Sequence, residues 1–166
     1  PMARLHIINI LARFNRAEVQ RALQDLLGDG NKMIRAAVLS AMVKMDGPIE
    51  VARVCALLRD PELEVQNRAV ELLGRARDPE TVRHLVPVLK DESEQARRAA
   101  VEVLNEVGDA RSVKYLLEAI KDDDWWVRSR AGDALGKIGG PKVIDAVLEL
   151  VRDKDEDIRR AAIEIL

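Results

Sequence analysis

The 166-residue sequence is poor in the residue types that most catalytic and metal sites use. It has one cysteine and two histidines, and aromatic residues make up only 2% of the chain. A single cysteine excludes an intramolecular disulfide and fits a reducing compartment, so we expect a cytoplasmic protein. Neither a secretory signal nor a membrane-spanning segment is visible, so the many apolar residues must be buried within the protein itself.

The charge balance excludes a partner held by long-range electrostatics alone. The formal net charge is −2, although 34% of the residues are charged. Residues 1–60 hold a slight excess of basic groups, and the rest of the chain holds an excess of acidic groups. This mild tilt differs from the basic arm or patch typical of proteins that bind nucleic acid or anionic membranes.

Motifs for catalysis or cofactor binding are also missing from the sequence. The glycines do not form a phosphate-binding loop, and no Ser-His-Asp or Cys-His set has a plausible spacing. The histidines, His6 and His84, are far apart, and neither is followed by glutamate. Cys55 lies in an apolar helical stripe, where a lone thiol usually acts as a small hydrophobic group. We therefore expect no metal, no cofactor and no enzymatic activity.

What the sequence does have is a pattern that returns every 31 residues. An apolar reference residue recurs at this interval, and further apolar residues follow it by four, seven, eight and eleven positions. The six reference residues are Ala3, Ile34, Val65, Ala96, Val127 and Ile158. Such a stripe lies on one side of a helix, and a repeat of this length indicates a solenoid.

Each repeat also contains a second amphipathic helix. In the last copy, apolar residues between Val143 and Val151 form the stripe of this helix. A repeat is therefore two antiparallel helices that bury their stripes against neighbouring repeats. We predict a leading helix at 1–14 and then five helix pairs. The pairs are expected at about 17–27 and 31–45, 48–58 and 62–76, 79–90 and 93–107, 110–121 and 124–138, and 141–152 and 155–166.

Residues that favour helix ends stand near these boundaries. Pro48, Pro79 and Pro141 recur at equivalent positions, and each suits the first turn of a helix. Good N-cap residues stand three positions before the reference residues in most repeats. The predicted caps are Asn31, Ser93, Asp124 and Asp155, with Asp60 followed by Pro61 in one repeat.

The repeat resembles the HEAT repeats, and most closely the short HEAT-like repeats first noted in phycobilisome bilin lyases. The elements that carry the likeness are Asp-x(5)-Arg at 122–128, Ala-x-x-Ala-Leu-Gly-x-Ile-Gly at 131–139 and Pro-x-x-Ile at 141–144. The resemblance covers the entire chain. It implies an all-α fold, a right-handed α-solenoid of stacked antiparallel helix pairs, with about five repeats of 31 residues after one leading helix.

Apolar stripe residues fall at both ends of the sequence. They are Ile7, Ile10 and Leu11 at one end, and Ile158, Ile165 and Leu166 at the other. Solenoids need polar terminal units, so we expect residues 1–166 to be a single HEAT-like array that is a fragment of a longer chain. We also expect the exposed ends to promote end-to-end self-association.

One aspartate position and one arginine position recur through the repeats. The family resemblance implies a ladder of hydrogen bonds between neighbouring units, and we favour this over an anion-binding row because the two residue types are matched in number. The ladder residues are Asp29, Arg35, Asp60, Gln66, Asp91, Arg97, Asp122, Arg128, Asp153 and Arg159. Since Gln66 replaces an arginine, we expect Asp60 to have a weaker partner, and Asp60→Ala to cost less stability than Asp122→Ala.

The candidate binding surface lies on outward positions of the second helices, which line the concave face in such pairs. Its centre is Trp125 and Trp126, the only tryptophans, at positions that other repeats fill mostly with polar residues. One ring alone could instead seal the turn, but two exposed rings beside arginines are typical of a binding hot spot. The predicted contact residues are Trp125, Trp126, Ser129, Arg130, Asp133, Glu94, Gln95, Arg98, Glu102, Asp157 and Arg160.

The chemistry of these residues leaves three functions open. We place a protein-binding scaffold or regulatory module first, with a partner whose carboxylates bind Arg98, Arg130 and Arg160. A bilin lyase-like component would bind an open-chain tetrapyrrole against the tryptophans and Asp133. A nucleic-acid-binding protein of the HEAT-like DNA glycosylase type is third, because the acidic groups of the groove would repel phosphates. Gly132, where other repeats have larger residues, indicates close helix packing or, alternatively, room for a ligand.

Overall fold

A computed structural model describes residues 2–166 and shows α-helices and short 3-10 helices joined by turns. The all-α solenoid fold predicted from the repeat is confirmed. The chain divides into two compact units, of which the first ends at His84 and the second runs from Leu85 to Leu166. The helix α6 (Thr81–Leu85) spans this division. The prediction of one continuous array stays a prediction.

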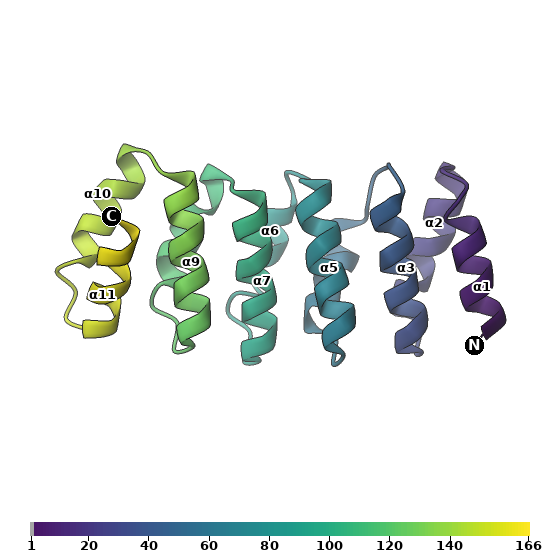
Figure 1. The fold of residues 1–166 in the computed structure, drawn as a ribbon, viewed down its shortest axis with the longest axis horizontal. Coiled ribbons are helices and arrows are strands. Elements are labelled where there is room, and N and C mark those ends of the chain that lie inside the picture. The colour runs from purple at the N-terminus through teal and green to yellow at the C-terminus, as the bar shows by residue number, and fades with distance from the viewer. Residues whose placement is uncertain (1) are drawn as a thin grey trace. The chain divides into compact units, whose positions relative to one another are not determined.

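In the first unit, α1, α3 and α5 form one layer, with α3 in contact with both of the others (Figure 1). The helices of this unit are α1 (Met2–Leu11), α2 (Ala17–Asp25), α3 (Lys32–Lys44), α4 (Val51–Ala56) and α5 (Leu63–Ala76). The second layer consists of α2, which contacts α3, and α4, which contacts α5. Fully buried leucines between the layers, such as Leu39 and Leu73, form the core.

In the second unit, α9 contacts α7 on one side and α11 on the other (Figure 1). The helices are α7 (Glu94–Val107), α8 (Val113–Ala119), α9 (Trp125–Ile138), α10 (Pro141–Leu150) and α11 (Glu156–Ile165). Behind this layer, α8 contacts α9 and α10 contacts α11. Leu104 and Leu135 are fully buried at equivalent places in α7 and α9, as the register of the repeat predicts.

The second helix of each pair agrees with its predicted bounds within a residue or two, whereas most first helices are shorter. Pro48 and Pro79 lie outside helices, and only Pro141 occupies the first turn of one, so the prediction was wrong for two prolines. Three first helices include a 3-10 turn, which shortens their α-helical part. These turns are η1 (Leu26–Gly28), η2 (Leu57–Arg59) and η3 (Ala110–Ser112). The leading helix also ends early, at Leu11, and its predicted first residue, Pro1, lies outside the described residues.

Side-chain caps explain why the second helices begin so close to their predicted positions. The side chains of Asn31, Ser93, Asp124 and Asp155 each accept a hydrogen bond from a backbone N–H in the first helical turn. In α5 the cap prediction was wrong, because the N-cap residue is Glu62 and its side chain makes no cap bond. The Asp60 carboxylate accepts from the Glu62 N–H and also binds an arginine of the preceding repeat.

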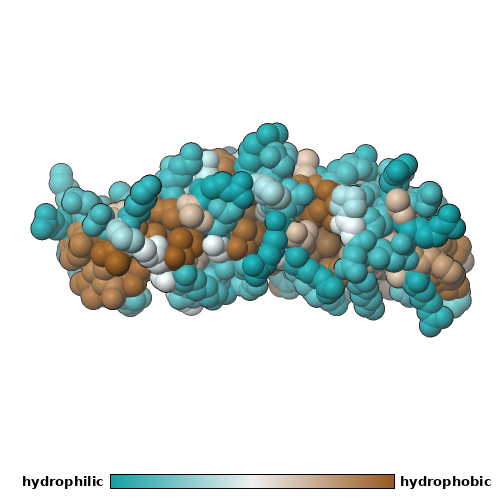
Figure 2. Space-filling model, turned by 90° about the horizontal axis from the view of Figure 1, so that it is seen from above, coloured by the Kyte–Doolittle hydropathy of each residue, from teal (hydrophilic) through white to brown (hydrophobic). Residues whose placement is uncertain are grey.

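Apolar side chains remain exposed on α1 of the first unit and on α11 of the second. Ile7 of α1 and Ile163 and Leu166 in and after α11 are all more than half exposed. In the second unit, Figure 2 shows apolar surface over α10 and α11. Self-association of the 166-residue chain through these residues stays a prediction. Cys55, in contrast, is buried, and this burial raises the pKa of its thiol to about 12, so the thiol is inert at neutral pH.

Arg77 ends α5 in a left-handed conformation, with φ 47° and ψ 36°. Gly108 ends α7 with nearly the same angles, φ 59° and ψ 36°. A side chain raises the energy of this conformation by about 1 kcal/mol relative to glycine. We therefore expect Arg77→Gly to stabilise the protein by about 1 kcal/mol in urea denaturation, and Gly108→Ala to destabilise it by a similar amount. Equal denaturation midpoints for Arg77→Gly and the unmodified protein would contradict this.

Candidate functional site

Arginine–aspartate pairs join each repeat to the next within the first unit. The Nε and Nη2 of Arg35 donate to the two carboxylate oxygens of Asp60, at 2.7 and 2.9 Å. The Nη1 of Arg35 donates to the backbone oxygen of Asp29, at 2.8 Å. The two paired side chains are only 11% and 4% exposed. The pair therefore lies out of water and ties α3 to the turn that precedes α5.

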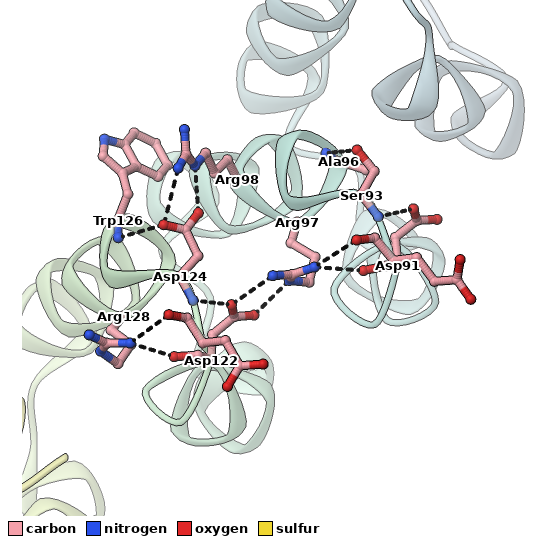
Figure 3. A network of polar contacts seen from close by, with 11 residues as sticks. Asp91, Ser93, Ala96, Arg97, Arg98, Asp122, Asp124, Trp126 and Arg128 are labelled. Carbon is pink, nitrogen blue, oxygen red and sulfur yellow. Dashed lines mark hydrogen bonds and ion pairs between the residues drawn. The ribbon is translucent and has the colours of Figure 1, made fainter. Parts of the chain in front are cut away.

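The second unit contains the same arrangement between α7 and α9 (Figure 3). Arg97 binds the Asp122 carboxylate with two hydrogen bonds, at 2.8 and 3.0 Å, and donates to the backbone oxygen of Asp91 at 2.9 Å. The hydrogen bond to Asp122 raises the pKa of the Arg97 guanidinium. Asp122 also accepts from the backbone N–H of Asp124, which fixes the turn before α9. The two charged groups bind each other, so the geometry favours a structural role over an anion-binding row.

The expectation that Gln66 weakens the pairing of Asp60 was wrong. Asp60 receives its bidentate bond from Arg35, which belongs to the preceding repeat, and not from the residue six positions later. The ladder arginines also donate to the backbone oxygen of the aspartate six residues earlier. Gln66 keeps this bond, since its Nε2 donates to the backbone oxygen of Asp60 at 2.7 Å. Asp60 is consequently one of the best-bound carboxylates among the ladder residues.

Between α9 and α11 the bidentate pair is missing from the described residues of the second unit. Arg128 donates to the backbone oxygens of Asp122 and Asp123, at 2.7 and 3.0 Å. Its Nη2 lies 3.8 Å from the carboxylate of Asp157, while the Asp153 carboxylate lies 3.6 Å from Lys121. The backbone oxygen of Asp153 accepts from Arg159 of α11. We call the two-hydrogen-bond pair of an arginine and an aspartate, as between Arg97 and Asp122, a charged fork. This junction is thus held without the charged fork that joins α7 to α9.

The two tryptophans differ in environment. Trp125, the first residue of α9, is 65% exposed. Trp126 is half-buried, and the guanidinium carbon of Arg130 lies 5.6 Å from the centre of its ring. The backbone N–H of Trp126 donates to the capping carboxylate of Asp124, which Arg98 also binds (Figure 3). Trp126 is therefore part of a packed cluster, whereas Trp125 is open to a partner.

The arginines around the tryptophans already hold carboxylates of this chain. Arg130 binds Glu102 with two hydrogen bonds, at 2.7 and 2.6 Å, and Asp133 with a third at 2.9 Å. Arg98 binds both carboxylate oxygens of Asp124, and this bond lowers the pKa of Asp124.

Arg160 is paired as well, with Glu156 at 3.1 Å. The prediction that these arginines bind the carboxylates of a partner was wrong for Arg98 and Arg130, because carboxylates of this chain occupy both with two hydrogen bonds. For Arg160, whose side chain is 65% exposed and makes a single contact, it stays a prediction.

A groove of about 420 Å³ lies between α9 and α11. Ser129, Gly132 and Gly136 of α9 line it together with Ala161 and Ile165 of α11. The charged lining residues are Arg128, Asp133, Lys137 and Glu164. Trp125 is four residues before Ser129, a spacing that places it on the stripe of α9 that faces this groove.

Two glycines open this groove for different reasons. A Cβ at Gly132 would lie 3.3 Å from Cγ1 of Ile165, so the absence of a side chain lets α11 approach closely. A Cβ at Gly136 would meet no atom within 4 Å, so the space beside it is empty of protein. Gly132 therefore serves close helix packing, whereas room for a ligand is found at Gly136.

The outward residues of α7, α9 and α11 form one surface of the second unit, which we call the tryptophan face. Its residues are Glu94, Gln95, Arg98, Glu102, Glu106, Trp125, Trp126, Ser129, Arg130, Asp133, Lys137, Glu156, Asp157, Arg160 and Glu164. Glu94 and Gln95 are exposed at the start of α7, and Asp157 is exposed at the start of α11. The sequence prediction missed Gly136, Ala161 and Ile165. The signal for them was the pair of glycines four residues apart on the stripe of Trp125.

Among residues 2–166, no helix is long and apolar enough to cross a membrane. The same residues contain no group of three or more His, Cys, Asp or Glu side chains arranged to hold a metal ion.

These features define a helical repeat protein built from stacked helix pairs. The HEAT-repeat family matches residues 1–74, 51–125 and 82–166, which together cover the whole chain. The chain therefore belongs to the HEAT-repeat family, as its repeat indicated. A comparison with curated proteins found no match.

Solved structures of similar fold come from several kinds of protein. The complex of CpcE and CpcF of phycocyanin lyase from Nostoc sp. is 18% identical, with a TM-score of 0.59 over 90% of this chain and 99% of that chain. Human deoxyhypusine hydroxylase is 17% identical, with a TM-score of 0.58 over 99% and 78%. A designed armadillo repeat protein in complex with peptide (KR)4 is 18% identical, with a TM-score of 0.52 over 97% and 90%. These likenesses show the fold alone.

Proposed function

We propose that this chain is a protein-binding module whose contact surface is the tryptophan face, centred on Trp125. The observation that carries the proposal is the 65% exposure of Trp125 at the first turn of α9. Interface hot spots are enriched in tryptophan, so an exposed indole beside a groove is a candidate anchor for a partner. The neighbouring groove between α9 and α11 would receive the rest of the bound segment.

The surroundings of Trp125 support recognition rather than packing. The residue is not needed by the core, since other repeats have Glu94 or Glu156 at the same position. Asp124 caps α9 firmly through the Trp126 N–H, so Trp125 is presented on a rigid element. Rigid aromatic anchors lose little conformational entropy on binding. Among solved structures of similar fold, one is the complex of CpcE and CpcF, and another is a designed armadillo repeat protein in complex with a peptide.

Photo-cross-linking from Ser129, whose side chain is exposed within the face, tests this proposal. A photoreactive amino acid replaces Ser129 in one variant and Lys142, exposed on α10, in a matched control. We expect discrete protein adducts in cell extract from position 129, their loss when Trp125→Ser is added, and none of the same adducts from position 142. The same adducts from both positions, or adducts that survive Trp125→Ser, would overturn the proposal.

A further inference from the structure

We infer that the segment bound by the tryptophan face is a basic peptide, which places an arginine or lysine on Trp125 and an apolar side chain in the groove between α9 and α11. This inference rests on the proposed function and adds the chemistry of the partner. It follows from three observations on the second unit: the charge of the face, the free tryptophan ring and the shape of the groove.

The tryptophan face has an excess of carboxylates that its own cations do not neutralise. Seven acidic residues share it with four basic ones. Arg98, Arg130 and Arg160 are each held by acidic side chains of the same chain. Glu106, Glu164 and Lys137 make no ion pair with other described residues, and all three are exposed. Because carboxylates still outnumber cations on the face, an incoming cation is attracted more strongly than an incoming carboxylate.

The protein itself shows how a cation is held on this face. The Arg130 guanidinium lies over the Trp126 ring, and the carboxylates of Glu102 and Asp133 bind its N–H groups. An indole ring attracts a cation through its electron-rich face, and flanking carboxylates add charge-assisted hydrogen bonds.

Trp125 offers an exposed ring, with one exposed carboxylate at the start of the neighbouring helix. Its ring is mostly exposed, and the carboxylate of Asp157 reaches α9 one turn later, at Arg128. The Asp157 side chain is itself 62% exposed, so it can bind a cation from a partner. A partner arginine or lysine stacked on Trp125 would thus complete the arrangement that Arg130 forms on Trp126.

The groove limits the length and character of the segment. From Trp125 to Gly136 the helix rises by about 16 Å, which an extended peptide of about five residues spans. The volume of about 420 Å³ accepts one or two aliphatic side chains, and Gly132, Gly136 and Ala161 leave the floor apolar and shallow. Glu164, which lines the groove, would meet a second cation. The expected ligand therefore has basic residues on both sides of an apolar one.

The test is selection of a random 12-residue phage-displayed peptide library on the immobilised 166-residue protein. Selected peptides are then measured by fluorescence anisotropy on the unmodified protein, on Gly136→Leu, on Trp125→Ser and on Lys142→Leu. Leucine at 136 fills the groove, and the variant should fold because a Cβ there meets no atom within 4 Å and leucine favours helix. Lys142→Leu adds the same side chain on α10, away from the face.

We expect the selected peptides to carry a net positive charge and to bind Gly136→Leu and Trp125→Ser at least about tenfold more weakly, with Lys142→Leu unchanged. Acidic or neutral peptides that lose affinity on Trp125→Ser would overturn the inference and leave the proposed function standing. Basic peptides unaffected by Gly136→Leu would overturn the assignment of the groove. Peptides that bind all variants equally, or no enrichment, would overturn both.

Discussion

Replacing Asp60 with alanine should lower the free energy of unfolding by about 3 kcal/mol, because it leaves the nearly buried guanidinium of Arg35 without its partner. The carboxylate also accepts from the Glu62 N–H, so the change removes a bond that shapes the turn before α5. For a chain of this size the melting temperature should fall by about 6–12 °C. Urea denaturation and thermal melting followed by circular dichroism measure both quantities.

The comparison of three aspartates distinguishes this explanation from a general effect of losing a turn residue. Asp122→Ala removes the equivalent partner of Arg97 and should cost about as much as Asp60→Ala. Asp153→Ala should cost clearly less, because the Asp153 carboxylate meets only the Lys121 ammonium and backbone N–H groups. Equal losses for all three variants, or a small loss for Asp60→Ala, would show that the charged fork is not what holds the repeats in register.

The two tryptophans should separate binding from stability. We expect Trp125→Ser to weaken partner binding by about 30-fold, the value of one interface hot spot, while the unfolding free energy stays within about 0.5 kcal/mol. Trp126→Ser should instead lower stability by about 1 kcal/mol, because the half-buried ring stacks on Arg130.

Isothermal titration with a selected peptide and urea denaturation of the same samples give the two readouts. Trp126→Ser serves as the matched control, since it removes an indole one residue away. If Trp125→Ser unfolds the protein, the ring belongs to the core and the binding site lies elsewhere. If both variants keep full affinity, neither ring contacts the partner.

The helices could be predicted from sequence because their signals are local. The stripe through Val127, Ala131 and Leu135 repeats in every copy, and capping residues such as Asp124 mark where the helices begin. First helices such as α4 and α8 were less predictable, because their short apolar stripes do not show whether a turn is α or 3-10. Packing between repeats decides that.

The polar contacts were only partly predictable, because they depend on neighbours 25 or more residues away. Nothing near Asp60 in sequence shows that Arg35 binds it, so the replacement at Gln66 was misread. The register placed Trp125 on the surface correctly, but it could not show that Glu102 would occupy Arg130. The groove arises from Gly136 and from the side chains of α11 beside it, which only the folded structure brings together.

Because the charged fork is missing between α9 and α11, we expect a ligand in the groove to stabilise the last helix pair. Where two helices lack a buried fork, the outer one can separate from the rest in a partial unfolding at lower free energy, and its amide protons then exchange sooner. A segment bound between Ser129 and Ala161 contacts both helices at this junction. Its binding free energy would therefore be added to the protection of α11, so the ligand would stabilise a helix pair that lacks a buried fork.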